Sequence, residues 1–292
     1  MSSIPETFAG LRYEGGPHGV LMLHGLSANS MELARLAKDL HVQGFTVHAP
    51  DLAGYCYGSE PQAWTTWLEG AQAHLWAMQK TCDTVSVVGL SMGATLGLVL
   101  AQRESLTALC LLSTALAYDG WAMPWYQFLS KWASWLPFAQ YYRFVEEEPF
   151  GVKNEEMRAL IKRSMKQDHI SESGADVLSV RHIAEGQKLI RAAREGMGQV
   201  HSPVLFIHAV DDETVHVRNS DWAYEHVGSR EKQIIYLGDS YHMITVDNER
   251  ETVSQEVVRA LKQAVNRSMG EAVFELPPIQ SPALRRALRQ KA

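Results

Sequence analysis

The sequence predicts an α/β protein with a mostly parallel central sheet, helices on both of its faces, and an inserted helical cap. Short apolar runs alternate with amphipathic stretches through residues 1–114, which is the pattern of successive β-α-β units. The alternation stops near residue 115 and resumes near residue 200. A chain of 292 residues fits one α/β domain that carries an insertion.

The first part of the chain contains four predicted strands and three predicted helices. Apolar runs predict strands at 20–23, 45–49, 85–89 and 108–113. Near-helical spacing of apolar residues predicts helices at 30–42, 61–80 and 94–102, the last of which is rich in small side chains. Gly44 is the expected end of the first helix because glycine readily adopts the conformation that closes helices.

The middle of the chain is predicted to be the cap. It begins with a cluster of aromatic residues and continues with charged helices at 155–166 and 182–194. Strands at 204–210 and 233–237 then resume the sheet, and a helix at 249–265 follows. We therefore divide the chain into 1–114 (first part of the core), 115–199 (cap insertion), 200–268 (second part of the core) and 269–292 (tail).

Composition excludes several classes of function. The net charge of −6 provides no basic field for nucleic acid. The three cysteines form neither a metal-binding pattern nor an even disulfide framework, so a reducing compartment is expected. Neither a signal peptide nor an apolar run long enough for stable membrane insertion is apparent, which predicts a cytoplasmic protein. The tail is expected to be a partly ordered surface segment, with a partner-subunit contact in a homodimer as the alternative.

The central motif is the G-x-S-x-G pentapeptide at 89–93, in which Ser91 is the candidate nucleophile. Chance alone would supply this pattern in roughly one chain in ten of this length. Here it lies directly after the predicted strand at 85–88 and directly before a predicted helix. This strand–turn–helix context is the one in which the motif carries a nucleophilic serine. A sharp turn between strand and helix exposes the serine to a base and a substrate, and Gly89 and Gly93 allow the close approach that the turn requires.

A second segment, His24-Gly25-Leu26-Ser27, follows an early strand. Acyl transfer develops negative charge on a carbonyl oxygen, which backbone N–H groups can stabilise. We expect the N–H groups of Leu26 and Met92 to form this oxyanion hole, and His24 to be a turn histidine bonded to the backbone.

The base and its orienting acid are expected in the order Ser, Asp or Glu, then His. His242 follows the strand at 233–237, and it is the candidate base. Asp212 follows the strand at 204–210 and is the favoured acid; Asp211 and Asp239 remain alternatives. The other histidines fit less well: His216 is too close to Asp212, His226 lies within a predicted helix, and His201 and His208 precede the acid.

With these motifs, the sequence resembles the bacterial carboxylesterases and monoacylglycerol lipases of the α/β-hydrolase superfamily. The similarity covers most of residues 18–265 and rests on segments 24–30, 44–50, 89–93, 211–213 and 240–245. The resemblance implies the α/β-hydrolase fold and maps the family's acid onto Asp212, its base onto His242, and its oxyanion donors onto Leu26 and Met92. Two parts of the chain depart from the family's pattern: residues 52–58 and the aromatic-rich cap. Both departures leave the expected reaction class unchanged and bear on which substrate is bound.

These observations predict a serine carboxylic-ester hydrolase that forms an acyl-enzyme on Ser91, requires no metal or cofactor, and acts on small to medium esters with apolar acyl or aryl groups. Trp121, Trp125 and Tyr126 of the cap are the candidate substrate-binding residues, while most other cap aromatics are expected to pack internally. Alternatives with the same triad are amide, carbamate or thioester hydrolysis and acyl transfer. A non-catalytic scaffold would be expected to lack a triad residue, and epoxide hydrolases and haloalkane dehalogenases use an aspartate nucleophile.

Overall fold

A seven-stranded sheet forms the centre of the computed structural model, which describes residues 9–121, 143–145, 148–167 and 177–276. The strand order is β1-β3-β2-β4-β5-β8-β9, and all neighbours run parallel except the antiparallel pair β1–β3. The strands are β1 Gly10–Tyr13, β2 His18–Leu23, β3 Thr46–Pro50, β4 Thr84–Leu90, β5 Leu109–Leu112, β8 Val204–Ala209 and β9 Lys232–Leu237. The predicted fold class is confirmed.

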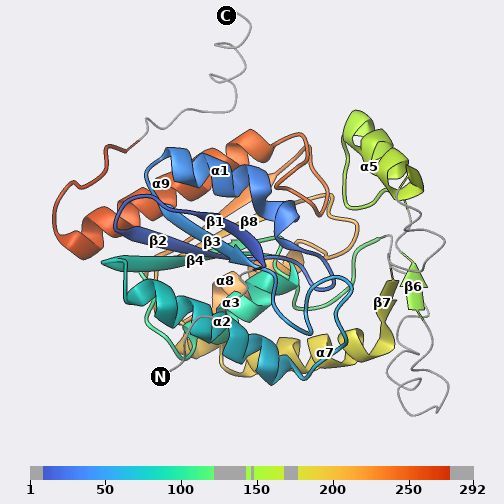
Figure 1. The fold of residues 1–292 in the computed structure, drawn as a ribbon, viewed down its shortest axis with the longest axis horizontal. Helices are drawn as coiled ribbons and strands as arrows, with labels where there is room; N and C mark the ends of the chain where they lie inside the picture. Colours follow the sequence, from blue (N-terminus) through green and yellow to red (C-terminus); the bar gives the residue numbers. More distant parts are fainter. Residues whose placement is uncertain (1–8, 122–142, 146–147, 168–176, 277–292) are drawn as a thin grey trace, which may run out of the picture.

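Helices cover both faces of this sheet, with α1 and α9 on one side and α2 and α3 on the other (Figure 1). The α-helices are α1 Ala34–Val42, α2 Trp64–Gln79, α3 Met92–Ala101, α5 Glu155–Gln167, α7 Val180–Glu195, α8 Arg218–His226 and α9 Arg250–Met269. Short 3₁₀ turns lie at η1 Ser30–Leu33 and η4 Met197–Gln199. The predicted helix at 30–42 is thus a 3₁₀ turn followed by an α-helix, and Asn29 caps the turn by accepting from the N–H of Met31 at 2.9 Å.

The hydrophobic core has two layers because successive strand residues point to opposite faces. Val20 and Met22 of β2 pack in the layer beneath α1 and α9, whereas Leu21 and Leu23 pack in the layer that includes α2 and α3. All six residues of β2 are buried, as are all seven of β4. This explains why these strands read as continuous apolar runs rather than alternating ones.

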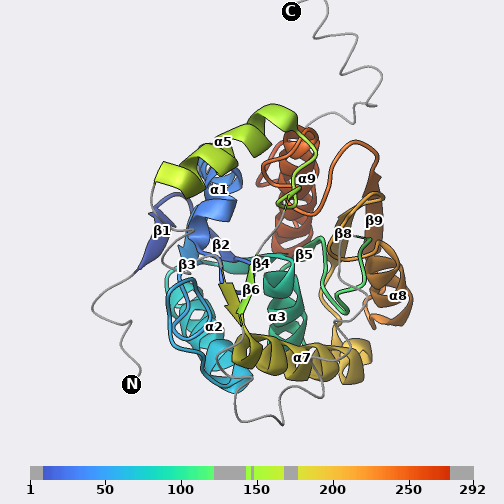
Figure 2. The same ribbon diagram turned by 90° about the vertical axis from the view of Figure 1, so that its right-hand side faces the viewer.

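The segment between β5 and β8 has described elements on different sides of this body (Figure 2). Its described elements are α5, α7 and a small antiparallel ladder of β6 Arg143–Val145 and β7 Val177–Ser179. Figure 2 shows α7 lying across α2 and α3, on the side of these helices away from the sheet. Leu189 and Ala193 of α7 join the core layer of α2 and α3, so the C-terminal part of the predicted cap packs on the body. The domain boundaries themselves stay a prediction.

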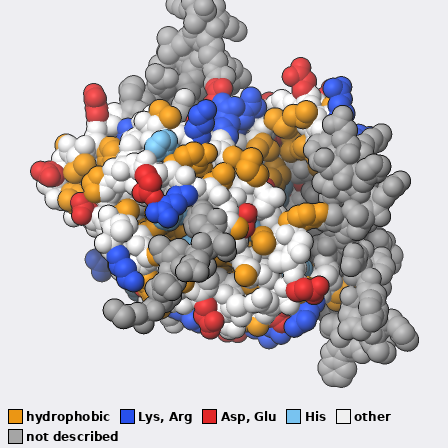
Figure 3. Space-filling model, viewed as in Figure 1, with side chains coloured by type: hydrophobic (Ala, Val, Ile, Leu, Met, Phe, Trp, Pro, Cys, Tyr) orange, Lys and Arg blue, Asp and Glu red, His pale blue; other side chains and the backbone are white. Residues whose placement is uncertain are grey.

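The surface carries charges of both signs. Acidic and basic side chains are interspersed with hydrophobic ones over the face in Figure 3, so this face offers no charge of a single sign over a wide area. Within the described residues, no helix has both the length and the apolar character needed to cross a membrane.

Candidate active site

Ser91 occupies a sharp turn between β4 and α3. Its backbone has φ = 55°, a conformation that costs non-glycine residues about 1–3 kcal/mol and that recurs at functional sites. A Cβ on Gly89 would lie 2.4 Å from the carbonyl oxygen of Gly93, and one on Gly93 would lie 2.1 Å from that of Leu23. The close approach expected of both glycines is therefore confirmed. The N–H of Ser91 donates to the carbonyl of Leu112 at 2.8 Å, which fixes the turn against β5.

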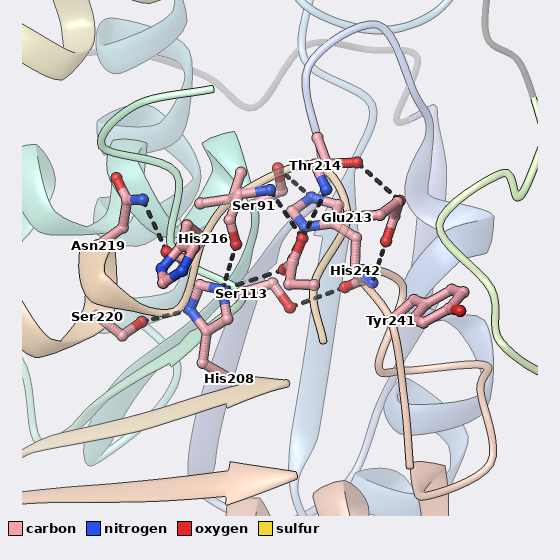
Figure 4. Close-up of polar contacts among 12 residues, drawn as sticks. Ser91, Ser113, His208, Glu213, Thr214, His216, Asn219, Ser220, Tyr241 and His242 are labelled. Atoms are coloured by element: carbon pink, nitrogen blue, oxygen red, sulfur yellow. Dashed lines mark hydrogen bonds and ion pairs between the residues drawn. The ribbon is translucent and has the colours of Figure 1, made fainter. Parts of the chain in front are cut away.

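Three side chains from distant parts of the chain form one hydrogen-bonded series. Nε2 of His242 lies 2.8 Å from Oγ of Ser91, and Nδ1 of His242 lies 2.8 Å from Oδ2 of Asp212. Because an ionised carboxylate only accepts, Nδ1 carries the hydrogen and Nε2 is left to accept from the serine hydroxyl. Figure 4 shows Ser91 and His242 approaching one another from different loops. Ser91 keeps 9% of its surface exposed, whereas Asp212 keeps 2%.

The carboxylate of Asp212 accepts on both oxygens. Oδ1 receives the backbone N–H groups of Thr214 at 2.9 Å and Val215 at 2.7 Å, which fold the loop after β8 around it. Burial alone raises the pKa of this carboxyl, but the charge of His242 and the N–H groups of His208 and His242 outweigh burial and hold it well below its usual range. Asp212 is therefore ionised at neutral pH.

The rival acids point elsewhere. Oδ2 of Asp211 lies 3.0 Å from Nζ of Lys153, and Oδ1 of Asp239 lies 3.5 Å from the same nitrogen. Both carboxylates are largely exposed. Of the rival histidines, His216 contacts the backbone N–H of Arg218 through Nδ1, and His226 bonds the backbone of its own helix.

The backbone of His242 is held at both ends by residues that the sequence did not indicate. Its N–H donates to Oε2 of Glu213 at 3.1 Å, and its carbonyl accepts from Oγ of Ser113 at 2.7 Å. Figure 4 shows Ser113 and Glu213 on either side of the His242 loop. Glu213 is buried, and the only signal for it in the sequence was a second carboxylate directly after the candidate acid Asp212.

The charge around His242 favours its protonated form. Burial lowers the pKa of this imidazole, but the carboxylates of Asp212, Glu213 and Glu32 outweigh burial and raise it above the usual value for histidine. An imidazolium that forms here is therefore stabilised, as a general base requires while it holds the serine proton.

The loop after β2 and the start of α3 each provide one backbone donor for the proposed oxyanion hole: Leu26 from the loop and Met92 from the helix. Within the described part of the chain, the N–H groups of Leu26 and Met92 have no hydrogen-bond acceptor, whereas Gly25 donates to Oε2 of Glu32 at 3.0 Å and Ser27 to the carbonyl of Tyr55 at 2.9 Å. The Leu26 and Met92 side chains meet over α7, where each would lie 3.3 Å from a Cβ on Gly186. The N–H groups of Leu26 and Met92 are thus available for a ligand.

Two further residues singled out in the sequence, His24 and Trp121, are described by the structure. Nδ1 of His24 donates to the carbonyl of Gly25 at 2.7 Å, which confirms its expected place as a turn histidine bonded to the backbone. Trp121 is 64% exposed; its Nε1 donates to the carbonyl of Asp211 at 3.2 Å, and its ring meets that of Tyr241 edge-on at 5.8 Å. It therefore lies beside the acid and histidine loops. Trp125 and Tyr126 lie outside the described residues.

Known proteins share both the sequence pattern and the fold. A carboxylesterase of Bacillus subtilis is 23% identical over 86% of this chain and 95% of its own. A thermostable monoacylglycerol lipase of a Bacillus species is 25% identical over 80% of this chain and 86% of its own. The structure of a monoacylglycerol lipase from Paleococcus ferrophilus, 18% identical, superposes with a TM-score of 0.72 over 87% of this chain and 98% of its own.

These likenesses confirm the resemblance inferred from the motifs, and the superposition confirms the α/β-hydrolase fold. A family model described as serine aminopeptidase S33 matches residues 17–250, a span that includes Ser91, Asp212 and His242. The chain therefore belongs to the serine aminopeptidase S33 family.

Proposed function

We propose that this protein is a carboxylic-ester hydrolase that uses Ser91, His242 and Asp212 as its catalytic triad. The observation that carries the proposal is the unbroken series of hydrogen bonds from Ser91 through His242 to Asp212, at the turn between β4 and α3. Ester hydrolysis is the reaction class for which the two Bacillus relatives are named, and it is the class that the sequence predicts.

In the proposed mechanism, Oγ of Ser91 attacks the ester carbonyl carbon while Nε2 of His242 takes the hydroxyl proton. The negative charge that develops on the carbonyl oxygen is stabilised by the N–H groups of Leu26 and Met92. Collapse of the tetrahedral species breaks the bond to the alkoxy group, which leaves with the proton from His242. Water then attacks the acyl-enzyme by the same steps, and this releases the carboxylic acid and restores Ser91.

The proposed substrates are small to medium esters with apolar acyl or aryl groups, and the proposed partner is this small molecule alone. Apolar side chains on the two proposed oxyanion donors support this class, since those of Leu26 and Met92 lie together against α7. Trp121, Trp125 and Tyr126 are proposed to contact the substrate, within a cap at 115–199. A cytoplasmic location and a homodimer stay predictions.

A covalent label tests the nucleophile. A fluorophosphonate should modify wild type, and peptide mapping should place the adduct on Ser91; an adduct elsewhere would refute the assignment. Ser91→Ala should lower kcat on a short-chain p-nitrophenyl ester by about 10⁶-fold. The mutant should melt close to the wild-type temperature, because the change removes a single hydroxyl whose hydrogen-bond partner is His242 and leaves the backbone turn in place.

The leaving group tests the reaction. The same acyl group should be offered as a p-nitrophenyl ester, a p-nitroanilide and a thioester, because the triad could also serve amide or thioester hydrolysis. We expect the ester to give the highest kcat/KM. Faster cleavage of the anilide would replace the proposed function with amide hydrolysis, a reaction to which the family description also points.

A further inference from the structure

We infer that His208 is a positioning residue that holds Asp212 in the geometry needed to orient His242. This inference rests on the proposed function of Ser91, Asp212 and His242. His208 lies in β8, four residues before Asp212, and it is completely buried. Figure 4 shows it behind the acid loop, on the side away from Tyr241, and next to Ser220 of α8.

The neighbours of His208 define which ring nitrogen carries hydrogen. Nε2 lies 2.9 Å from the carbonyl oxygen of Val215 and 3.0 Å from Oδ2 of Asp212, and both of these oxygens can only accept. Nε2 therefore carries a hydrogen, which is shared between the carbonyl and the carboxylate. Nδ1 lies 2.6 Å from Oγ of Ser220, whose hydroxyl can donate to it. Neutral His208 is thus satisfied on both nitrogens.

The consequence for Asp212 is that one oxygen, Oδ2, faces two imidazoles. It lies 2.8 Å from Nδ1 of His242 and 3.0 Å from Nε2 of His208, while Oδ1 is held by two backbone N–H groups. The carboxylate cannot rotate without losing one of these contacts inside a buried site. His208 also ties Val215, and thereby the loop that supplies those N–H groups, to β8 and α8.

Structural histidines also occur in this protein, and one of them offers a matched control. His18 is buried in β2, and its Nδ1 lies 2.9 Å from a hydroxyl, that of Thr84. It lies at the start of its strand, whereas Ser91 and the loops of Asp212 and His242 follow the ends of theirs. His18→Leu therefore removes an equivalent buried imidazole without touching the site.

The decisive variants are His208→Leu and His208→Gln. Leucine fills similar space without a donor, so we expect kcat on a p-nitrophenyl ester to fall about 10- to 100-fold, the range found for groups that orient histidine and carboxylate ligands in metal sites. KM should change little, because no substrate contact is lost. Glutamine offers an amide N–H and an oxygen at the spacing of the two ring nitrogens, and it should restore most of kcat.

Two further readouts separate positioning from a purely structural role. In His208→Leu, Oδ2 of Asp212 loses one N–H donor, so its negative charge is less compensated. This charge then raises the pKa of His242 further, and the acidic limb of kcat/KM should move to higher pH. The far-downfield proton resonance of the His242–Asp212 hydrogen bond should shift or broaden. His18→Leu should change neither readout even where it lowers the melting temperature equally.

The inference fails if folded His208→Leu retains the kcat and pH profile of wild type while the fluorophosphonate still labels Ser91. It also fails if His18→Leu reproduces the kinetic changes. If His208→Leu does not fold, Ser220→Ala decides the question, because it removes the donor to Nδ1 and should lower kcat several-fold at constant KM. An unlabelled Ser91 in wild type would instead refute the proposed function itself.

Discussion

At the scale of single residues, the proposed triad is oriented by side-chain and backbone groups outside it. Glu213 and Ser113 hold the backbone of His242, and backbone N–H groups hold Asp212. Glu32 has a different place, because its Oε2 accepts the N–H of Gly25 while its charge also raises the pKa of His242. Glu32 therefore both holds the loop after β2 and affects the pKa of the proposed base, His242.

Replacement of Glu32 by Gln tests that electrostatic contribution. The amide oxygen of Glu32→Gln can still accept from Gly25, but the negative charge is lost. Because that charge favours imidazolium, its loss lowers the pKa of His242, and a larger fraction of the base is neutral at acidic pH. We expect the acidic limb of kcat/KM to move to lower pH, so that kcat/KM at a fixed pH on that limb rises about two-fold.

The measurement is the pH profile of kcat/KM with a p-nitrophenyl ester. Glu271→Gln, which removes an exposed carboxylate just after α9, provides a control with the same change in net charge. Equal shifts in both variants would mean that net charge, rather than the position of Glu32, sets the acidic limb.

At the scale of elements, three segments meet at the buried carboxylate of Asp247. It accepts the N–H groups of Lys153 at 2.8 Å and Asn154 at 2.9 Å, where α5 begins, and that of Tyr241 at 2.8 Å, next to His242. Lys153 in turn bridges to Asp211 in the acid loop. The start of α5 is thereby joined to both loops of the proposed triad.

Asp247→Ala should therefore affect both stability and catalysis. It leaves several backbone N–H groups without their acceptor, so the free energy of unfolding should fall by about 2–4 kcal/mol. Loosening of the loop beside His242 should lower kcat as well. Urea unfolding and ester hydrolysis measure the two effects.

Asp239→Ala is the matched control, because its carboxylate belongs to the same loop but is exposed and lies 3.5 Å from Lys153. Such a pair contributes about 0–1 kcal/mol. If both variants lost stability equally, the inference that the Asp247 carboxylate joins the start of α5 to the triad loops would be refuted.

At the scale of the whole molecule, the sequence predicted the parallel sheet because its inner strands β2, β3, β4, β5 and β8 are buried on both faces. Strand β1 escaped prediction since it is a short, partly exposed edge strand with no apolar run. Helix α8 was only hinted at, because few of its side chains are buried and its composition is largely polar. Patterns of hydrophobicity report burial, and elements with little burial give a weak pattern.

The candidate site divides in the same way. Ser91, Asp212 and His242 were found because chain order and position after a strand restrict them. His208 was considered only as a rival base. The sequence shows that it is a polar residue within an apolar strand, but it does not show which groups its ring nitrogens contact. Those partners, Ser220 and Val215, lie on other segments and depend on the packing of α8 against β8.

The whole molecule should also lose stability in acid through its buried histidines. Burial lowers the pKa of five of them: His18, His24, His48, His74 and His182. At His48, burial, followed by the nearby charge of Arg12, lowers the pKa to about 4. Below the unfolded value of about 6.5, the unfolded chain binds protons that the folded protein excludes, so stability falls as pH falls towards 4.

His48→Gln isolates one part of this effect. Between pH 6.5 and about 4 it should reduce the slope of unfolding free energy against pH by up to one proton, or about 1.4 kcal/mol per pH unit. Urea unfolding at several pH values measures the slope, with His226→Gln, an exposed position on α8, as the control. A wild-type slope in His48→Gln would show that His48 is protonated equally in both states, and acid sensitivity would then have to come from other groups.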